Sequence, residues 1–235
     1  WRSVHDTFCR EVMGRENDEL RDNWKRTFLV IWVGQFFSIL TSSIVGYAIT
    51  FWLSLKTGSA EVLAYLFAAT ILPQVLLGPF VGVYVDRWDR KRTMIISDTF
   101  IAVCTVVLVV LLRMGIESLA AIYILQICRS LGTAFHTPSM QASVPLLTPE
   151  SQLTRIAGVN QMIYSVSTIA GPALGALAIT VTSIENVLML DVFGALIAAG
   201  SLLFIVIPRP NRDNAVYHFL SELKESVRAI AAVKG

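Results

Sequence analysis

The residues best suited to chemistry in this chain are Arg129 and His136, which carry ionisable groups within a stretch of otherwise apolar and small side chains. With Gly132 they follow a spacing of i, i+3 and i+7, so all three share one face of a helix. A cation inside a membrane helix normally faces a cavity or a charged partner. We therefore expect Arg129 either to face a cavity or to hold a structural ion pair, with Asp98 as the candidate partner. For His136, which lies near the inner end of its segment, a hydrogen bond at the membrane interface is the preferred explanation over proton chemistry.

The densest group of charges lies at residues 82–92, between two long apolar runs. A charge at the centre of a bilayer costs about 2.5–3.5 kcal/mol on insertion scales, so this stretch must form a loop between two membrane helices. Its four cations predict that the loop is cytoplasmic. We expect Gly82 to let a neighbouring helix approach closely. Asp86, one turn later, is expected to reach Arg90 or the positive end of a facing helix.

This stretch resembles the signature loop between helices 2 and 3 of the major facilitator superfamily, Gly-x-x-x-Asp-Arg-x-Gly-Arg-Lys/Arg. The residues that match are Gly82, Asp86, Arg87, Arg90 and Lys91. Asp89 stands where most members of that family have a second glycine. The resemblance implies that the loop controls a conformational change of a transporter rather than substrate contact.

The composition independently indicates an integral membrane protein. Hydrophobic residues make up 54% of the chain and charged residues only 15%, which is too apolar for an ordinary soluble domain. Six apolar runs have about the length that crosses a bilayer, at residues 27–53, 62–85, 93–112, 119–137, 156–181 and 187–207. The net charge of +2 does not suggest a nucleic-acid partner. The three cysteines have no metal-ligand spacing, so no metal or other cofactor is expected.

The chain divides into three parts. Residues 1–26 alternate acids and bases, which predicts a solvated cytoplasmic arm, and residues 27–207 form the six-helix transmembrane domain. Pro208 and Pro210 stop the last helix, and 208–235 resembles the start of the central cytoplasmic loop of a twelve-helix transporter. Cations gather at one set of helix ends, so both ends of this multi-pass protein should face the cytoplasm from the cell membrane. Because Trp1 rather than methionine is first, we expect a fragment. The resemblance to a twelve-helix transporter implies that a C-terminal six-helix half is absent from it.

A short pattern in the chain recurs 93 residues later. Its first copy is Gly78-Pro79-x-x-Gly82 with Asp98-x-Phe100-x-Ala102, and its second is Gly171-Pro172-x-x-Gly175 with Asp191-x-Phe193-x-Ala195. Two copies of three helices each must be inserted upside down relative to one another, because three is odd. Inverted repeats of this kind occur within each half of major facilitator transporters. The predicted fold is therefore an all-α membrane protein of six transmembrane helices in two inverted three-helix repeats; chance matching of short apolar motifs is the alternative.

Two helix motifs resemble drug:proton antiporters of the same superfamily. Leu125 and Arg129 match the helix 4 motif Leu-x-x-x-Arg-x-x-Gln-Gly, although its glutamine is absent. The helix 5 motif Gly-x8-Gly-x3-Gly-Pro-x-x-Gly-Gly is matched by Gly158, Gly171, Pro172 and Gly175. The resemblance implies proton coupling through Arg129, with Asp98 as a candidate carboxylate. The small residues allow close helix packing, and the proline favours a kink or hinge.

Polar residues at helical spacing form two candidate walls of a substrate cavity: Gln35, Ser38 and Ser42 in the first segment, and Gln161, Tyr164 and Thr168 in the fifth. Dispersed amides and hydroxyls near aromatic rings suit a large amphipathic substrate better than a sugar or a phosphate. Polar contacts between helices explain any one of these residues equally well.

The leading hypothesis is the N-terminal half of a secondary active transporter, resembling the macrolide-efflux type, that exports amphipathic drugs by proton antiport and is not an enzyme. Its expected partners are the drug, protons, the lipid bilayer and the second half. One alternative is a membrane-embedded enzyme with a polar centre at Asp98, Arg129 and His136, although no nucleophile–base spacing or metalloprotease motif supports it. Another is a six-helix membrane scaffold without transport activity.

Overall fold

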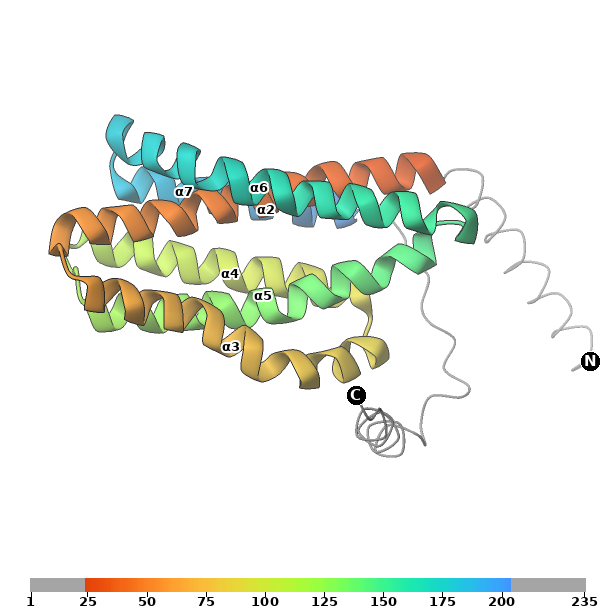
Figure 1. The fold of residues 1–235 in the computed structure, drawn as a ribbon, viewed down its shortest axis with the longest axis horizontal. Helices are drawn as coiled ribbons and strands as arrows, with labels where there is room; N and C mark the ends of the chain where they lie inside the picture. Colours follow the sequence, from red (N-terminus) through yellow and green to blue (C-terminus); the bar gives the residue numbers. More distant parts are fainter. Residues whose placement is uncertain (1–23, 204–235) are drawn as a thin grey trace, which may run out of the picture.

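The computed structural model describes residues 24–203, which form six long helices and one short 3-10 turn, with no strand in that range. The elements are α2 (Trp24–Thr57), α3 (Ala60–Arg87), α4 (Arg90–Arg113), α5 (Leu119–Leu147), η1 (Glu150–Gln152), α6 (Leu153–Val181) and α7 (Ile184–Leu203) (Figure 1). The predicted all-α fold is confirmed. Most of the predicted arm at 1–26 and all of the segment at 208–235 lie outside the described residues.

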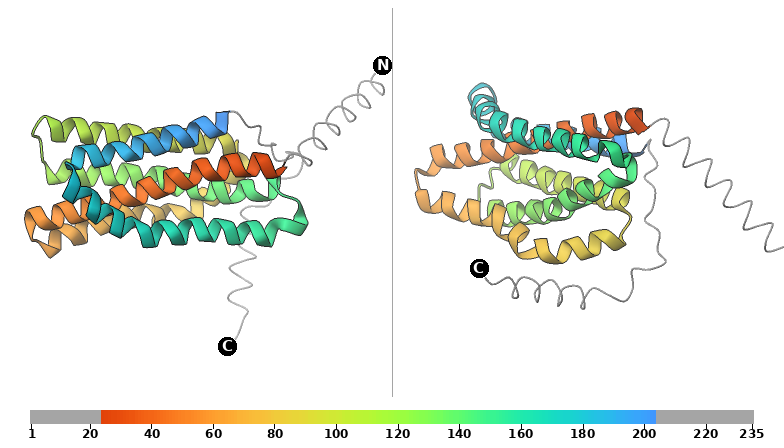
Figure 2. Two further views of the ribbon diagram at one scale, coloured as in Figure 1. Left: turned by 90° about the horizontal axis from the view of Figure 1, so that it is seen from above. Right: turned by 45° about the vertical axis from the view of Figure 1, so that its right-hand side comes forward.

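The six helices run side by side along one direction, as the three views agree (Figures 1 and 2). Among the described residues, α2, α3, α4, α6 and α7 are long and apolar enough to cross a membrane. α5 is less apolar because it carries Gln126, Arg129 and His136, all of which are buried. It packs between α3 and α4, so its polar groups face other helices. The protein is therefore a multi-pass membrane protein.

The packing order of the helices is α3, α5, α4, α7, α2, α6. If α2 is interchanged with α5, α3 with α6 and α4 with α7, the same pairs of neighbouring helices result. Each helix of the second set begins 93–95 residues after its counterpart, and α2 and α5 run in opposite directions (Figure 1). The predicted pair of inverted three-helix repeats is thus present, with α4 and α7 in contact at the centre.

The turn between α3 and α4 is shorter than the loop predicted at 82–92. α3 continues through Arg87 and α4 begins at Arg90, so only Trp88 and Asp89 connect them. The helix extends because Val81 and Val85, one turn apart, still bury their side chains at 1% exposure each. The charged residues of this stretch therefore lie in the last turn of α3, in the two-residue turn and in the first turn of α4.

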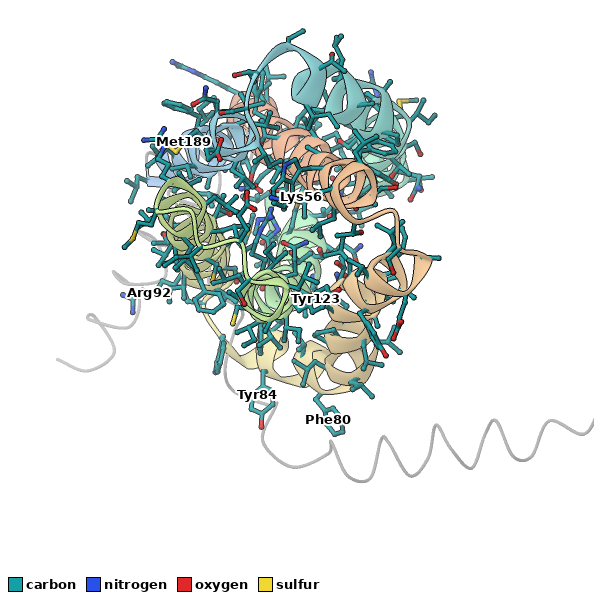
Figure 3. The ribbon with its side chains drawn as sticks, turned by 90° about the vertical axis from the view of Figure 1, so that its left-hand side faces the viewer. Lys56, Phe80, Tyr84, Arg92, Tyr123 and Met189 are labelled. Carbon is teal, nitrogen blue, oxygen red and sulfur yellow. The ribbon has the colours of Figure 1, made fainter. Side chains whose placement is uncertain are left out.

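Apolar packing is concentrated toward the two ends of the bundle. One buried cluster gathers around Trp32, Met94 and Met140, and the other around Ile49, Leu108 and Leu188. Viewed along the helices, Phe80 and Tyr84 project from α3 away from the bundle (Figure 3), and both are exposed. An outward apolar surface of this kind suits contact with lipid or with another membrane domain.

Candidate functional site

Between the two apolar clusters, a band of buried polar side chains crosses the bundle. Its charged or titratable members are Asp98 on α4 (3% exposed), Arg129 and His136 on α5 (7% and 6%) and Asp191 on α7 (1%). Ionisable groups inside a membrane are costly and seldom retained for packing alone. This band is therefore the candidate functional site.

Arg129 and Asp191 form the first centre of the band. The guanidinium Nη2 lies 2.8 Å from Asp191 Oδ2, and Nη1 donates a hydrogen bond of 3.1 Å to Gln126 Oε1. Asp191 also accepts hydrogen bonds from Thr105 Oγ1, at 2.7 Å to Oδ2, and from Ser42 Oγ to Oδ1. Donors from α2, α4 and α5 thus converge on one carboxylate of α7, and the charge-assisted bonds among them are strong.

His136 and Asp98 form the second centre. Imidazole Nε2 lies 3.3 Å from Asp98 Oδ1, and Ser38 Oγ donates to the same oxygen at 3.5 Å. The other oxygen, Oδ2, has no hydrogen-bond partner among the described residues. Asp98 is consequently less well satisfied than Asp191, although both are buried.

The structure corrects the predicted ion pair between Arg129 and Asp98, since Arg129 binds Asp191 instead. The reason is depth along the helices. His136 lies seven residues beyond Arg129, about 10 Å along α5 at 1.5 Å per residue. α4 runs antiparallel to α5, so Asp98 lies level with His136, and Thr105, seven residues after Asp98, lies level with Arg129.

Asp191 is the functional candidate that the sequence analysis missed. It entered that analysis only as the repeat counterpart of Asp98. The sequence did contain a signal for it, because an aspartate occurs at the same place in both copies of the repeat. A carboxylate inside a membrane needs a partner, so each copy had to supply one. The two counterparts in fact take different partners, an imidazole for Asp98 and a guanidinium for Asp191.

The glycines of the helix 5 motif bring α6 close to α2. A Cβ at Gly175 would lie 2.8 Å from the backbone oxygen of Ile44, and one at Gly171 would collide with the Ser43 side chain. Ser43 Oγ donates to the backbone oxygen of Ser167 at 2.9 Å, and Pro172 lies within α6. A Cβ at Gly158 would meet no described atom within 4 Å. This glycine of the motif therefore does not mark a close helix contact within the described chain.

The signature loop is tied to three helices. Asp89 is the N-cap of α4, its Oδ1 accepting from Arg92 N at 3.2 Å, and Trp88 stacks on Phe135 of α5 with 6.1 Å between ring centroids. Lys91 Nζ donates to the backbone oxygen of Leu203 at the end of α7, at 3.4 Å, which complements the negative end of that helix.

Of the other expectations for the loop, the one at Gly82 is not met within the described chain, and the one at Asp86 is not tested. Against the expectation of a close approach at Gly82, a Cβ there would meet no described atom within 4 Å. The residue lies on α3, an end member of the packing order, which explains the open space. Arg90 begins α4. The side chains of Asp86 and Arg87 lie outside the described part of the structure, so the expected contact between Asp86 and Arg90 stays a prediction.

The two predicted cavity walls occupy different environments. Gln35 and Ser38 are buried, Ser42 is partly buried, and both serines contact the aspartates of the band. Gln35 is 0% exposed, and its amide has no hydrogen-bond partner among the described residues. On α6, by contrast, Gln161 and Thr168 are exposed and Tyr164 is partly buried, with its hydroxyl 4.0 Å from Met140 Sδ. Their contact with substrate stays a prediction.

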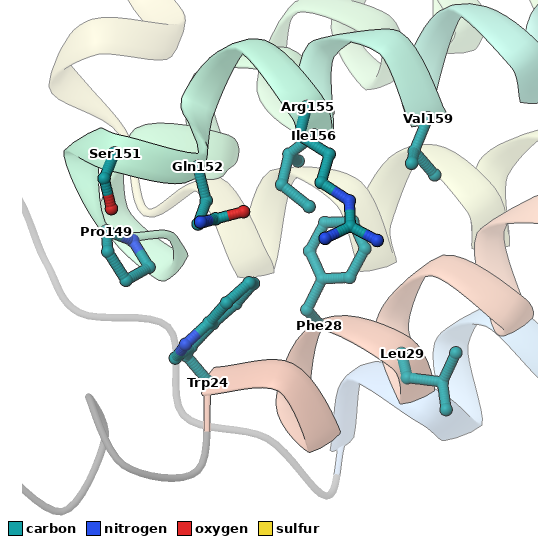
Figure 4. Close-up of a pocket in the computed structure, with 9 residues that line it drawn as sticks. All are labelled: Trp24, Phe28, Leu29, Pro149, Ser151, Gln152, Arg155, Ile156 and Val159. Atoms are coloured by element: carbon teal, nitrogen blue, oxygen red, sulfur yellow. The ribbon is translucent and has the colours of Figure 1, made fainter.

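A pocket of about 650 Å³ opens at one end of the bundle, between the first turns of α2 and α6 (Figure 4). Its lining is mostly apolar, with Arg155 as the charged member, and none of the predicted cavity residues contributes to it. Within residues 24–203, no group of three histidine, cysteine or acidic side chains is arranged to hold a metal ion.

Comparisons with known proteins place these features in context. Residues 31–230 match the family model described as Major Facilitator Superfamily. The chain is 39% identical over 219 residues to macrolide efflux protein A of Streptococcus pyogenes, covering 92% of this chain and 54% of that protein. It is 38% identical over 180 residues to macrolide efflux protein A of Enterococcus faecalis, covering 76% and 55%. The chain thus spans about half the length of these curated relatives.

Proposed function

The chain belongs to the major facilitator superfamily, and from that premise we propose that it forms the N-terminal half of a secondary active transporter that exports amphipathic, macrolide-like drugs in exchange for protons. The names of the relatives support macrolide export, and their roughly double length supports a second six-helix half. Substrate would bind between the two halves near the midplane and be released when the halves rock.

The observation that carries this proposal is the buried band of four ionisable side chains, centred on the 2.8 Å pair of Arg129 and Asp191. Intramembrane ionisable groups mark ion and substrate pathways. A guanidinium stays charged at any physiological pH and cannot itself carry the exchanged proton. In the proposed cycle Arg129 therefore acts by biasing other groups: it binds Asp191 directly, and it acts on Asp98, the candidate carboxylate, only indirectly from about two helical turns away.

The remaining motif residues receive mechanical roles in the proposal. The signature loop, with Gly82, Asp86, Arg87, Arg90 and Lys91, governs the conformational equilibrium at the membrane surface. Gly171, Pro172 and Gly175 supply a tightly packed joint between α6 and α2, with Gly158 as the outlying member of the motif. The exposed face of α6, with Gln161, Tyr164 and Thr168, contributes to the cavity between the halves. On α2, Gln35 and Ser38 are buried and Ser42 is partly buried, so in the proposal these three residues reach the substrate only when the helices move.

The orientation is proposed from the distribution of cations. Arg26, Arg155 and the run Arg90–Arg92 lie at the end of the bundle where α2, α4 and α6 begin, while Lys56 and Arg113 lie at the opposite end. Short cytoplasmic loops collect lysine and arginine. We therefore assign the first end to the cytoplasm, with both chain termini on that side of the cell membrane.

Uptake into inside-out vesicles that contain the complete gene product tests the function. A radiolabelled macrolide should accumulate when the vesicle interior is acid, and a protonophore should abolish the accumulation. Arg129→Ala should lose it at equal abundance, whereas Arg113→Ala, at the exposed end of α4, should retain it. Residues 1–235 expressed alone should not transport. Accumulation that survives the protonophore, or that residues 1–235 achieve at the full rate, would refute the proposal.

A further inference from the structure

We propose that the His136–Asp98 pair is the proton-binding site of this half, and that Asp191 is kept out of that role by Arg129. The inference rests on the proposed proton exchange and names the groups that perform it. The pair is buried inside the bundle, its two members come from adjacent helices α4 and α5, and its closest approach is 3.3 Å.

A count of charges in the band supports the assignment. Arg129 contributes one positive charge, and ionised Asp98 and Asp191 contribute one negative charge each. With a neutral His136 the buried band carries one net negative charge, which a low-dielectric interior strongly disfavours. One proton taken up by the His136–Asp98 pair brings the band to neutrality. Uptake adds the proton to imidazole Nε2 or to the carboxylate, and release returns it to water without any other bond changing.

The hydrogen bonds explain why the proton goes to this pair rather than to Asp191. Asp191 accepts from Ser42, Thr105 and Arg129, so a proton on it would displace a donor and leave the guanidinium unpaired. Asp98 has an oxygen without a partner in the described chain. Its neighbour is an imidazole, the side chain that gains and loses a proton near neutral pH.

The charge state of the His136–Asp98 pair depends on its own two members rather than on other charged groups around it. The other ionisable groups described on the packed elements are Arg90–Arg92, Cys104 and Arg113 on α4, Tyr123, Cys128 and Arg129 on α5, Arg155 and Tyr164 on α6, and Glu185 and Asp191 on α7. Arg129 is about two turns from His136 along α5, and its charge is taken up by Asp191. Near the pair, α2 presents Ser38, and the described charged side chain of α3, Glu61, lies at the opposite end of the bundle.

Helix α2 links the two centres. Ser38 and Ser42 lie one turn apart on it, and each donates to one aspartate of the band. A shift of α2 against α4 and α7 would therefore alter both carboxylates together. Such a shift provides a direct physical link between proton binding at Asp98 and rearrangement around Asp191.

The test uses the complete transporter with every histidine except His136 replaced by asparagine and with ¹³C-labelled histidine. The single imidazole signal should titrate, and Asp98→Asn should move its midpoint by about one pH unit or more, as expected when a charge in contact is lost. Thr105→Val, which removes a donor from Asp191 and leaves the pair intact, should leave the midpoint unchanged. A signal that does not titrate between about pH 5 and 9, or a midpoint indifferent to Asp98→Asn, would overturn the site.

A second measurement separates this inference from the proposed function. Addition of a macrolide to the purified transporter in weakly buffered solution should release protons, and His136→Gln should abolish the release. Gradient-driven efflux by His136→Gln at the wild-type level would refute the site while leaving proton exchange standing. Efflux by the wild type that ignores the pH gradient would refute proton exchange, whereas a titration of His136 that depends on Asp98 would still support the proton-binding site.

Discussion

Arg129 on α5 and Asp191 on α7, 62 residues apart in the sequence, are held 2.8 Å apart inside the bundle. Their side chains are only 9% and 1% exposed, so neither charge is solvated by water when the other is removed. A buried pair broken in this way leaves an uncompensated charge. The stability of this half therefore depends on both members being present or both being absent.

The first prediction concerns that dependence. Asp191→Ala should lower the free energy of unfolding by about 3–5 kcal/mol, and the double variant with Arg129→Ala should recover a large part of the loss. Glu117→Gln is the control, because it breaks the exposed Lys56–Glu117 pair, which is expected to contribute about 1 kcal/mol or less. Denaturant unfolding of the purified protein measures all of them. Strictly additive effects of the two alanine substitutions would contradict the coupling.

Arg129→Lys addresses function rather than folding. The guanidinium bridges Gln126 Oε1 and Asp191 Oδ2 with two different nitrogens, and a lysine keeps the charge but not this planar fork. We expect the variant to reach the membrane normally and to lose most pH-gradient-driven efflux, with Arg129→Ala no better. Wild-type dependence on the gradient in Arg129→Ala, at equal membrane abundance, would leave the residue a structural role alone.

Close packing of α6 on α2 can be tested with two glycines of one motif. Gly175→Ala places a Cβ 2.8 Å from the Ile44 backbone oxygen, which a side-chain rotation cannot relieve, so a loss of about 1–3 kcal/mol is expected. Gly158→Ala has open space around it and should be close to neutral. Thermal unfolding in detergent compares the two. Equal stability of both variants would show that α2 and α6 separate without cost.

Asp89 offers a test of the turn between α3 and α4. Its carboxylate caps α4, so Asp89→Ala should cost about 1 kcal/mol, whereas Asp89→Gly should cost only a few tenths. Aspartate and glycine are both accepted at an N-cap, which explains why Asp89 can replace the usual glycine of the signature loop. Hydrogen exchange at the first turn of α4 measures the difference. Faster exchange in the glycine variant than in the alanine variant would argue against capping.

The sequence alone was sufficient for the architecture. Lengths of apolar runs predict membrane helices because each helix satisfies its own backbone hydrogen bonds, and the 93-residue recurrence predicts the inverted repeat. The helix boundaries then follow within about four residues, except at residues 82–92 and at the end of α5, which runs to Leu147, ten residues beyond the predicted end at 137. At 82–92, valines that bury one face extend α3 into the charged stretch. Beyond residue 137, α5 continues because Met140, Val144 and Leu147 still bury their side chains against the bundle.

The partners of the charged side chains were decided by the tertiary structure. The sequence contains two buried aspartates in equivalent places, and nothing local distinguishes which of them meets Arg129 and which meets His136. That choice depends on the depth and rotation of α4, α5 and α7 relative to one another, and these are set by packing at the two apolar clusters and at the α2–α6 and α2–α7 contacts. A helix displaced by two turns presents a different residue at the same level, since each residue adds about 1.5 Å along the axis.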